Sequence, residues 1–335
     1  MPQSRFSLRM RATLLAASFT LLASCAGSTS GATASRAPRV APDAATLALL
    51  PGPKPWAPPE KLKSVVGEYD CRTSVCLVIE DGGRLWLLDT AKASPKRVPY
   101  EDAGMALKRR EVGPQAGTTQ LQVKPVRPIP AVRTEALAAS PPAEAAPARA
   151  AELVELVSVD PTIKLDIRYA TTNNFLGARF YDEARAFMQR PAADALVRAN
   201  KKLRTLGYGL LIHDAYRPWY VTKMFWDATP LDKRWLVANP ASGSKHNRGA
   251  AVDLTLFELS TGKPVEMPGT YDETTGRSFA DYPGGTSLQR WHRGLLRNAM
   301  VAEGFLVNPS EWWHFDYKSW RDYAIGNVAF DRIGK

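Results

Sequence analysis

Long apolar segments are nearly absent from this sequence, and beyond residue 25 none is long enough to span a bilayer. Basic blocks interleaved with aromatic residues are also missing, as are the motifs of nucleic-acid-binding proteins. The formal net charge of +11 is therefore weak support for a nucleic-acid partner, and we expect none. An anionic wall or membrane surface would suit this charge, although solvated Lys and Arg side chains explain it more simply.

Cysteine and histidine are scarce as well, with three and four residues in the whole chain. Cys71 and Cys76 lie within residues 57–125, where no histidine is present to complete a metal site. If the chain is exported, this pair enters an oxidising compartment, so we predict a disulfide between them. Apolar runs at 75–79 and 84–88 flank Glu-Asp-Gly-Gly, which predicts a β-hairpin. We expect residues 57–125 to form a small β-rich module, whose function the sequence does not indicate.

The N-terminus is typical of an export signal. Several arginines precede an apolar stretch over residues 12–22. The stretch ends in Leu-Ala-Ser-Cys, which resembles a bacterial lipoprotein cleavage box with Cys25 as the lipidated residue. Ordinary cleavage near Ala23 or Ala26 is the alternative and would leave a soluble periplasmic protein. We predict a signal over residues 1–25 and an exported, periplasmic protein held at the outer membrane by a lipid on Cys25.

Segments rich in Ala and Pro divide the rest of the chain. Residues 26–56 show little periodicity and are expected to form a disordered tether. Residues 126–150 are expected to form a Pro/Ala linker. The domain that carries the chemistry then spans residues 151–335, and the chain is long enough for this domain and the β-rich module.

Residues 151–335 mix strand and helix signals. Pro191 stands at the favoured first position of a helix, residues 210–213 are typical of a buried strand, and a last helix is expected over about 288–303. Because these signals do not alternate as regular βαβ repeats, we predict an α+β fold. The histidines of the strand and of the last helix, His213 and His292, are expected to be structural.

A histidine and an aspartate stand close together in the stretch Ser-Lys-His-Asn-Arg-Gly-Ala-Ala-Val-Asp at residues 244–253. The strand-like alternation that follows places Asp253 on one face and Val252 on the other, so the carboxylate can face a cleft. His246 would come from the preceding turn, to which Gly249 gives conformational freedom.

The stretch at residues 308–317 supplies a second histidine, His314. His246, Asp253 and His314 make three protein ligands, which leave zinc an open fourth position for water, as in a catalytic site. Glu311, three residues before the last ligand, is placed to act as general base on that water.

The two motifs, S-x-H-x-x-G-x-A-x-D followed by E-x-W-H, resemble those of the zinc D,D-peptidases, and more closely those of the VanX-type D-alanyl-D-alanine dipeptidases. Residues 166–171 and 214–218 match as well, and the similarity covers roughly residues 151–335. A second Trp within residues 311–314 departs from the pattern but keeps the Glu-to-His spacing. The resemblance implies one Zn²⁺ and a central antiparallel sheet flanked by helices, the hedgehog/D,D-peptidase-like zinc fold.

The resemblance also implies roles for residues outside the ligand set. Arg217, followed by Pro218 at the end of a buried strand, would stabilise the developing oxyanion. Tyr169 and Asp272 would hold the free ammonium group of the substrate. Ser244 would orient His246 or touch the substrate, unless it forms only a turn hydrogen bond.

Three functions are compatible with this sequence. The favoured one is zinc-dependent hydrolysis of D-Ala-D-Ala, or of a related dipeptide of D-configured residues, in the cell envelope. A D,D-carboxypeptidase or endopeptidase that trims peptidoglycan stem peptides would share the zinc core. A non-catalytic wall-binding lipoprotein is the alternative from another class, but every group that the chemistry needs is present. The sequence indicates neither protein partners nor an oligomeric state.

Overall fold

The computed structural model describes residues 41–71, 74–90, 96–103, 107–110 and 123–334. The predicted export signal and Cys25 lie outside these ranges. Within them, no helix combines the length and the apolar composition that crossing a membrane requires.

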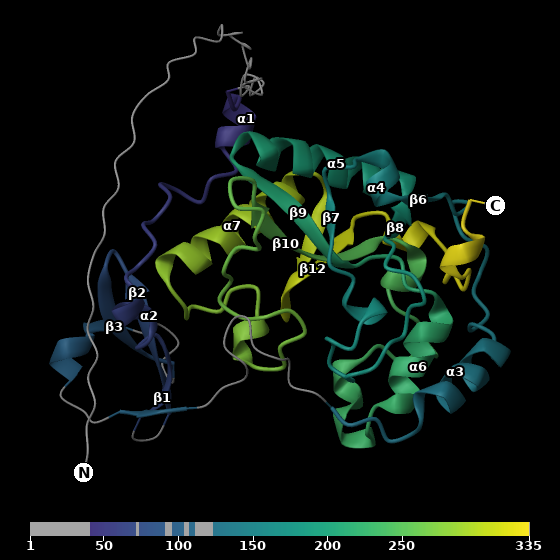
Figure 1. The fold of residues 1–335 in the computed structure, drawn as a ribbon, viewed down its shortest axis with the longest axis horizontal. Coiled ribbons are helices and arrows are strands. Elements are labelled where there is room, and N and C mark those ends of the chain that lie inside the picture. The colour runs from purple at the N-terminus through teal and green to yellow at the C-terminus, as the bar shows by residue number, and fades with distance from the viewer. Residues whose placement is uncertain (1–40, 72–73, 91–95, 104–106, 111–122, 335) are drawn as a thin grey trace, which may run out of the picture. The chain divides into compact units, whose positions relative to one another are not determined.

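A five-stranded sheet in the order β11-β12-β10-β9-β7 forms the centre of the peptide chain's largest core (Figure 1). Its neighbouring strands are antiparallel, except that the short edge strand β7 runs parallel to β9. The strands are β7 (Lys164–Leu165), β9 (Tyr208–Asp214), β10 (Ala251–Glu258), β11 (Phe305–Asn308) and β12 (Glu311–Tyr317). All of β9 and nearly all of β10 and β12 is buried, so both faces of these strands are covered. The α+β class is confirmed.

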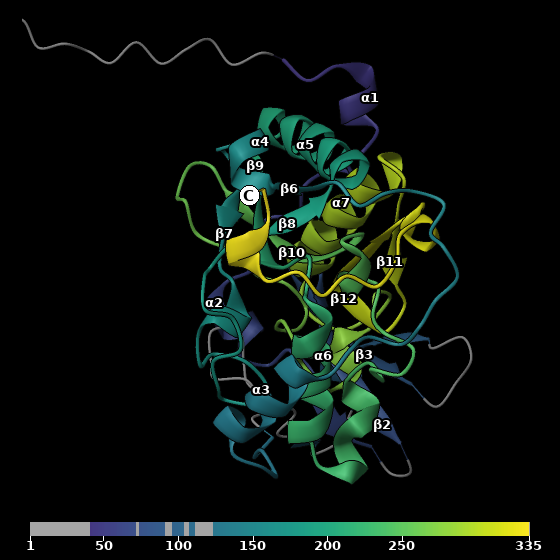
Figure 2. The same cartoon turned by 90° about the vertical axis from the view of Figure 1, so that its right-hand side faces the viewer.

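Two long helices, α5 (Arg190–Thr205) and α7 (Ser287–Ala302), pack against this sheet and against each other (Figures 1 and 2). Their bounds agree with the predicted helices to within about two residues. At the start of α7, the Thr286 hydroxyl accepts from Gln289 N, and the Gln289 side chain accepts from Thr286 N. This capping box supplies partners to two backbone donors at the helix end.

Helix α6 (Trp219–Ala228) begins directly after Pro218 and packs against α3 (Ile129–Ala138) (Figure 1). Helix α3 lies within residues 126–150, so the prediction that this whole range is a linker was wrong. Val132 and Ala136, one helical turn apart, are both fully buried in the main core. The Ala/Pro composition suggested a linker because it shows little periodicity, whereas contact with α6 provides the stabilisation that a ten-residue helix lacks in isolation.

Three short elements complete this part of the chain. Strands β6 (Leu153–Glu155) and β8 (Phe187–Gln189) pair antiparallel as a separate two-stranded sheet. Helix α4 (Leu156–Val159) follows β6 directly, and its Leu156 is fully buried in the main core.

The end of the predicted tether 26–56 also differs from the expectation, because it is ordered against the main domain. It contains α1 (Ala44–Leu47), followed by Leu49, which is buried in the main core. Two side chains of α7 bind its backbone: Asn298 Nδ2 donates to Leu49 O at 3.0 Å, and Trp291 Nε1 donates to Gly52 O at 3.0 Å. The segment is therefore anchored to α7 by hydrogen bonds as well as by apolar contact.

Residues 60–110 contain a second five-stranded sheet, in the order β4-β3-β2-β1-β5. Its elements are α2 (Glu60–Lys63), β1 (Gly67–Asp70), β2 (Val75–Asp81), β3 (Arg84–Asp89), β4 (Arg97–Pro99) and β5 (Lys108–Arg109). Strands β2 and β3 form a hairpin around Gly82 and Gly83, both with positive φ. This sheet belongs to the same compact unit as the central sheet.

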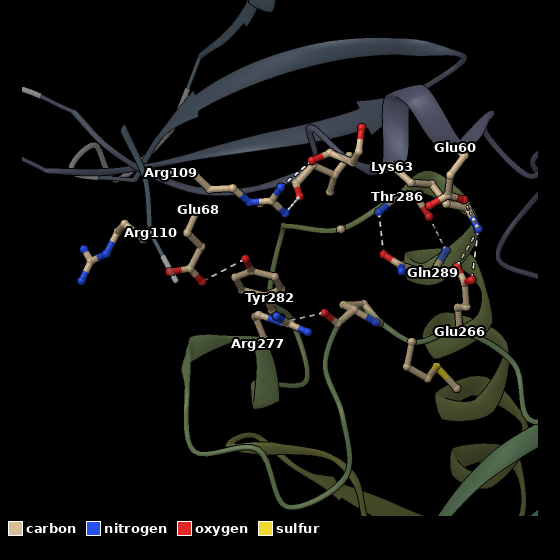
Figure 3. Close-up of a pocket in the computed structure, with 16 residues that line it drawn as sticks. Glu60, Lys63, Glu68, Arg109, Arg110, Glu266, Arg277, Tyr282, Thr286 and Gln289 are labelled. Atoms are coloured by element: carbon tan, nitrogen blue, oxygen red, sulfur yellow. Dashed lines mark hydrogen bonds and ion pairs between the residues drawn. The ribbon is translucent and has the colours of Figure 1, made fainter. Parts of the chain in front are cut away.

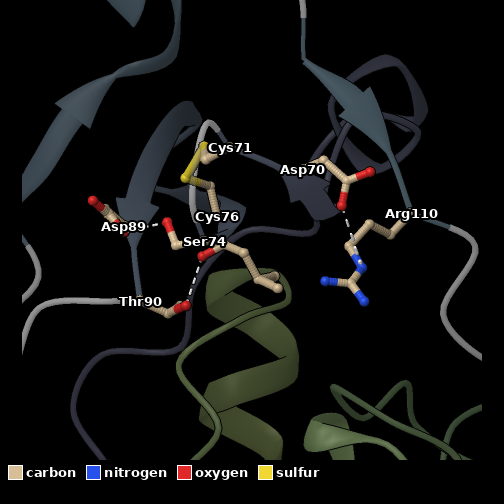
Figure 4. Close-up of a disulfide and its surroundings, with 8 residues drawn as sticks. Asp70, Cys71, Ser74, Cys76, Asp89, Thr90 and Arg110 are labelled. Carbon is tan, nitrogen blue, oxygen red and sulfur yellow. Dashed lines mark hydrogen bonds and ion pairs between the residues drawn. A yellow bond between two sulfur atoms is a disulfide. The ribbon is translucent and has the colours of Figure 1, made fainter.

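A disulfide joins Cys71 and Cys76 at the start of β2 (Figure 4). Nearby, Ser74 Oγ donates to Asp89 Oδ1 at 2.9 Å, and Thr90 Oγ1 donates to Val75 O at 2.6 Å. These bonds tie the beginning of β2 to the end of β3, so the disulfide closes a loop that is also held by hydrogen bonds.

Protonation of His292 is expected to destabilise the fold in acid. This α7 side chain is buried, its Nδ1 donates to Glu266 O at 3.2 Å, and its Nε2 lies 3.4 Å from the Tyr208 hydroxyl. Burial lowers the pKa of His292 to about 4, so between about pH 6.5 and pH 4 the unfolded chain binds the proton and the folded chain does not. The free energy of unfolding should fall across this range by on the order of 3 kcal/mol. Comparing the unfolding free energies of wild type and His292→Gln against pH isolates this contribution, and parallel curves would exclude it.

Candidate active site

The three predicted metal ligands come from two neighbouring strands and one turn. Asp253 on β10 and His314 on β12 are direct partners in the antiparallel register, so their side chains start from adjacent backbone positions. His246 begins a short 3₁₀ turn that ends at Gly249, whose φ is +65°. This left-handed φ favours glycine, and a Cβ at this position would also force the Leu153 Cδ2 methyl group, 2.5 Å away, to move. All three ligand residues are buried.

The donor atoms of these residues lie at spacings that suit a zinc ion. His246 Nε2 is 3.1 Å from His314 Nδ1 and 3.5 Å from Asp253 Oδ1, and His314 Nδ1 is 3.0 Å from Asp253 Oδ1. Tetrahedral zinc with bonds of 2.0–2.1 Å needs ligand atoms about 3.3 Å apart. In the described part of the chain, this is the one group of three or more His, Cys, Asp or Glu side chains so arranged. The residues therefore fit the metal that the motifs predict.

Each ligand is oriented by a further contact through its other polar atom. His246 Nδ1 donates to Ala215 O at 2.7 Å, and His314 Nε2 lies 2.9 Å from Asp316 Oδ1. The Tyr271 hydroxyl donates to Asp253 Oδ2 at 3.0 Å. These partners direct His246 Nε2, His314 Nδ1 and Asp253 Oδ1 toward one point.

The same contacts shift the proton affinities of the ligands. Burial alone would lower the pKa of His314, but hydrogen bonds with Asp253 and Asp316 raise it to about 10. Burial alone would raise the pKa of Asp253, but His246 and His314 hold it well below its usual range. The carboxylates around the two imidazoles thus create a site that favours positive charge, which a divalent cation can supply.

Glu311 lies at the start of β12, on the side of His314 that faces the other ligands. Its Oε2 accepts from Asn308 Nδ2 at 2.8 Å and is 3.7 Å from His314 Nδ1, the nitrogen that faces His246 and Asp253. Its side chain is 37% exposed, whereas those of the three ligands are at most 10% exposed. The carboxylate therefore reaches both solvent and the edge of the ligand group.

Arg217 is held rigidly next to this group. Its Nε and Nη2 donate to Asp214 Oδ2 at 3.0 and 2.7 Å, and its guanidinium lies over the rings of Phe225 and Tyr169 at 4.9 and 5.2 Å. Burial acts against the charge on Arg217, but Asp214 raises its pKa above the ordinary value, so the side chain stays cationic. Asp214 pairs with Asp253 in the β9–β10 register, which places Arg217 beside the ligand group.

The two residues predicted to bind an ammonium group meet in the structure. The Tyr169 hydroxyl donates to Asp272 Oδ2 at 2.9 Å. Asp272 is partly buried and has a φ of +56°, unusual for a non-glycine residue. Its withdrawal from water and the charge of Asp253 raise the pKa of Asp272 to about 8. A bound cationic group would stabilise the ionised carboxylate of Asp272 and so lower this pKa.

Ser244 lies in the turn before His246, where its Oγ accepts from His246 N at 3.2 Å. This is the turn hydrogen bond that the sequence left open as an alternative. His213 stays outside the ligand group: its Nδ1 lies 3.3 Å from Asp166 Oδ2, and its ring packs on Tyr271 at 4.6 Å.

The residues that orient the ligands were not singled out from the sequence. Asp316 lies two residues after His314 on β12, so the alternation of the sequence already places both on one face, but not as partners; Lys245 pairs with Asp316. Asp214 lies in the stretch that resembles the D,D-peptidases, but its bonds to Arg217 and to Tyr181 Oη become evident in the structure alone. No local signal points to Tyr271, which comes from a long irregular segment.

Comparisons with known proteins identify the family of this chain. The sequence model of a peptidase family, M15, described as D-ala-D-ala dipeptidase, matches residues 149–324. A D-alanyl-D-alanine dipeptidase of Escherichia coli (strain K12) is 34% identical over 174 residues, which cover 52% of this chain and 89% of the relative. Those of Enterococcus faecium and Streptomyces coelicolor are 33% and 35% identical, covering 50% and 49% of this chain and 91% and 89% of the relatives. The site residues described above all lie within the matched region, and the chain belongs to the D-ala-D-ala dipeptidase family of M15 peptidases.

Proposed function

We propose that this protein is a zinc-dependent dipeptidase that hydrolyses D-Ala-D-Ala or a closely related dipeptide of D-configured residues. The observation that carries the proposal is the buried His-Asp-His group with Glu311 beside it, 3.7 Å from a ligand nitrogen. The names of relatives in Escherichia coli and Enterococcus faecium, both D-alanyl-D-alanine dipeptidases, support the choice of substrate.

His246, Asp253 and His314 would hold the metal, which when bound supplies Lewis acidity toward the peptide carbonyl and makes a water molecule more acidic. Glu311 is placed to take a proton from the attacking water and to deliver it to the amine that leaves as the C–N bond breaks. Its exposure suits both tasks, because the carboxylate can contact solvent-derived water and the departing amino group.

Arg217 would stabilise the oxygen of the scissile carbonyl as it becomes negatively charged. Its pairing with Asp214, which also accepts from Tyr181 Oη at 2.7 Å, fixes the guanidinium before the substrate binds. A donor that is already oriented needs no reorganisation during the reaction. Asp214 and Tyr181 are thus positioning residues for Arg217.

Asp272 and Tyr169 would bind the free ammonium group of the dipeptide. An internal residue of a stem peptide has no such group, so this pair favours a dipeptide over the longer substrates of a carboxypeptidase or endopeptidase. The third possibility, a wall-binding lipoprotein without activity, would not require the arrangement of Glu311 and Arg217 around the metal ligands.

Removing the metal should abolish the activity. With full-length protein purified in detergent, we expect release of D-Ala from D-Ala-D-Ala, loss of this activity after dialysis against a chelator, and its return with one equivalent of Zn²⁺. A stem pentapeptide ending in D-Ala-D-Ala should remain intact. Cleavage of the pentapeptide alone would indicate a carboxypeptidase, and zinc binding without cleavage of either peptide would favour the binding protein.

We also propose that the protein acts outside the cytoplasm, attached to the outer membrane through a lipid on Cys25. The support is the Leu-Ala-Ser-Cys box after the apolar N-terminal stretch. Metabolic labelling with a fatty-acid analogue should mark the wild-type protein and should fail to mark Cys25→Ser. Equal labelling of both proteins would contradict the assignment of Cys25.

A further inference from the structure

We propose that the N-terminal sheet β1–β5 is a positioning element of the peptidase, and that Glu80 is the residue through which it acts. Glu80 fixes one end of residues 266–287, the irregular segment that brings Tyr271 and Asp272 into the site. The inference rests on the proposed dipeptidase function and deepens it, because it concerns how the substrate's ammonium group is bound.

Glu80 connects β2 to the start of α7. Its side chain is buried, with the residue 2% exposed, and Oε2 accepts from both Ser287 N and Ser287 Oγ, at 3.0 and 2.8 Å. Oε1 accepts from Gly83 N, at 2.8 Å, in its own hairpin. The carboxylate thus satisfies a backbone donor in the first turn of a helix and lies at the end of the helix dipole that favours negative charge. Arg290 of α7 donates in return to Glu80 O at 3.0 Å.

A second contact between the sheet and the segment involves Tyr282. Its hydroxyl donates to Glu68 Oε1 at 3.1 Å (Figure 3). Its ring is buried with Leu77, Ile79 and Leu88 of the sheet. A pocket of about 680 Å³ lies beside this contact, lined by residues of α2, β1 and β5 and of the segment. The sheet therefore contacts the segment at Tyr282 and at Ser287, and the pocket lies beside these two contacts.

The other end of the segment reaches the active site. Tyr271 donates to the ligand Asp253, and Asp272 accepts from Tyr169. Ala280 N donates to Pro309 O at 3.0 Å, two residues before Glu311. In the described chain, one 3₁₀ turn, Gly276–Ser278, is the regular structure between residues 266 and 286. With so little regular structure, side-chain contacts hold this segment together with a few backbone bonds such as that of Ala280, and they include the contacts around Asp272 with its positive φ.

The test compares Glu80→Ala with Glu60→Ala in the full-length zinc-loaded protein. Glu60, on α2 of the same part of the chain, has an 86% exposed side chain, so its removal controls for the loss of one negative charge. We expect Glu80→Ala to raise KM for D-Ala-D-Ala about tenfold, as the loss of charge-assisted hydrogen bonds would, with a smaller change in kcat and no change in zinc content. Amide hydrogen exchange should accelerate across residues 266–287 and not in β9 or β10.

Each outcome bears on one proposal. Unchanged KM and exchange in Glu80→Ala would overturn the inference, as would an equal loss of protection everywhere, which would make Glu80 a general stability residue. If wild type does not cleave the dipeptide, the proposed function fails, while the exchange measurement still decides whether the sheet fixes the segment. If Glu80→Ala does not fold, Tyr282→Phe tests the same idea. It removes a single hydroxyl at the second contact and should raise KM about threefold; an unchanged KM and unchanged exchange in it would count against the inference.

Discussion

Replacing Glu311 with Gln is expected to lower kcat for D-Ala-D-Ala by about 10³-fold, within the range that general acid–base catalysis contributes. Gln has nearly the same shape and can still accept from Asn308 Nδ2, which is 2.8 Å from Glu311 Oε2, so the start of β12 should keep its structure. What the variant cannot do is take up a proton from water and return it to the leaving amine. The measurement is steady-state kinetics on the zinc-loaded protein, together with metal analysis.

The zinc content distinguishes loss of the general base from loss of the metal site. Glu311 is not a member of the ligand group, so Glu311→Gln should bind one zinc with wild-type affinity. Glu60→Gln, at an exposed position, serves as the control and should behave as wild type. Activity close to wild type in Glu311→Gln would remove the role of general base. Loss of zinc together with activity would assign Glu311 to metal binding instead.

Arg217→Lys is expected to lower kcat by about 10²-fold, the lower end of the effect of removing an oxyanion donor. Lys preserves the positive charge next to Asp214, but it cannot reproduce the pair of bonds by which Arg217 Nε and Nη2 both donate to Asp214 Oδ2. Arg217→Ala is a poorer test, because it would leave Asp214, 1% exposed, without its cationic partner. Breaking a buried ion pair in this way costs about 3–5 kcal/mol of stability.

The kinetics should show a loss in the transition state and not in substrate binding. In Arg217→Lys, kcat and kcat/KM should fall together, with KM little changed. Arg185→Lys is a control for the same substitution away from the site, because Arg185 donates to both carboxylate oxygens of Glu155, at 2.8 and 2.9 Å, in a more exposed ion pair. A normal kcat with a lowered melting temperature in Arg217→Lys would show that this arginine is a structural ion pair.

The site was more predictable from the sequence than its surroundings, because the ligand motifs are local. His246 and Asp253 are separated by one turn and the beginning of a strand, so their spacing alone restricts where the side chains can point. The alternation predicted for β10 is interrupted by a register shift between Asp253 and Leu254. Such irregularities are common beside active sites, where they redirect one side chain, and nothing in an apolar run reveals their position.

Contacts between distant parts of the chain were the least predictable. Glu80 and Ser287 are 207 residues apart, and neither has a local pattern that indicates a partner. Composition suggested a tether and a linker where the structure has Leu49 and α3 in the main core. Short helices and extended segments with weak propensity become ordered through tertiary packing, which sequence composition does not describe.

Residues 44–53 and the N-terminal sheet both pack against the main domain, and this limits how far the protein can be truncated from its N-terminal side. The family match begins at residue 149, yet the compact unit begins near residue 40. A protein shortened to the matched region would expose the apolar surface of Tyr282 and would deprive Ser287 N and Trp291 Nε1 of their acceptors. The region matched by the family is thus shorter than the compact unit that contains it. A protein truncated at the family boundary should therefore be less soluble.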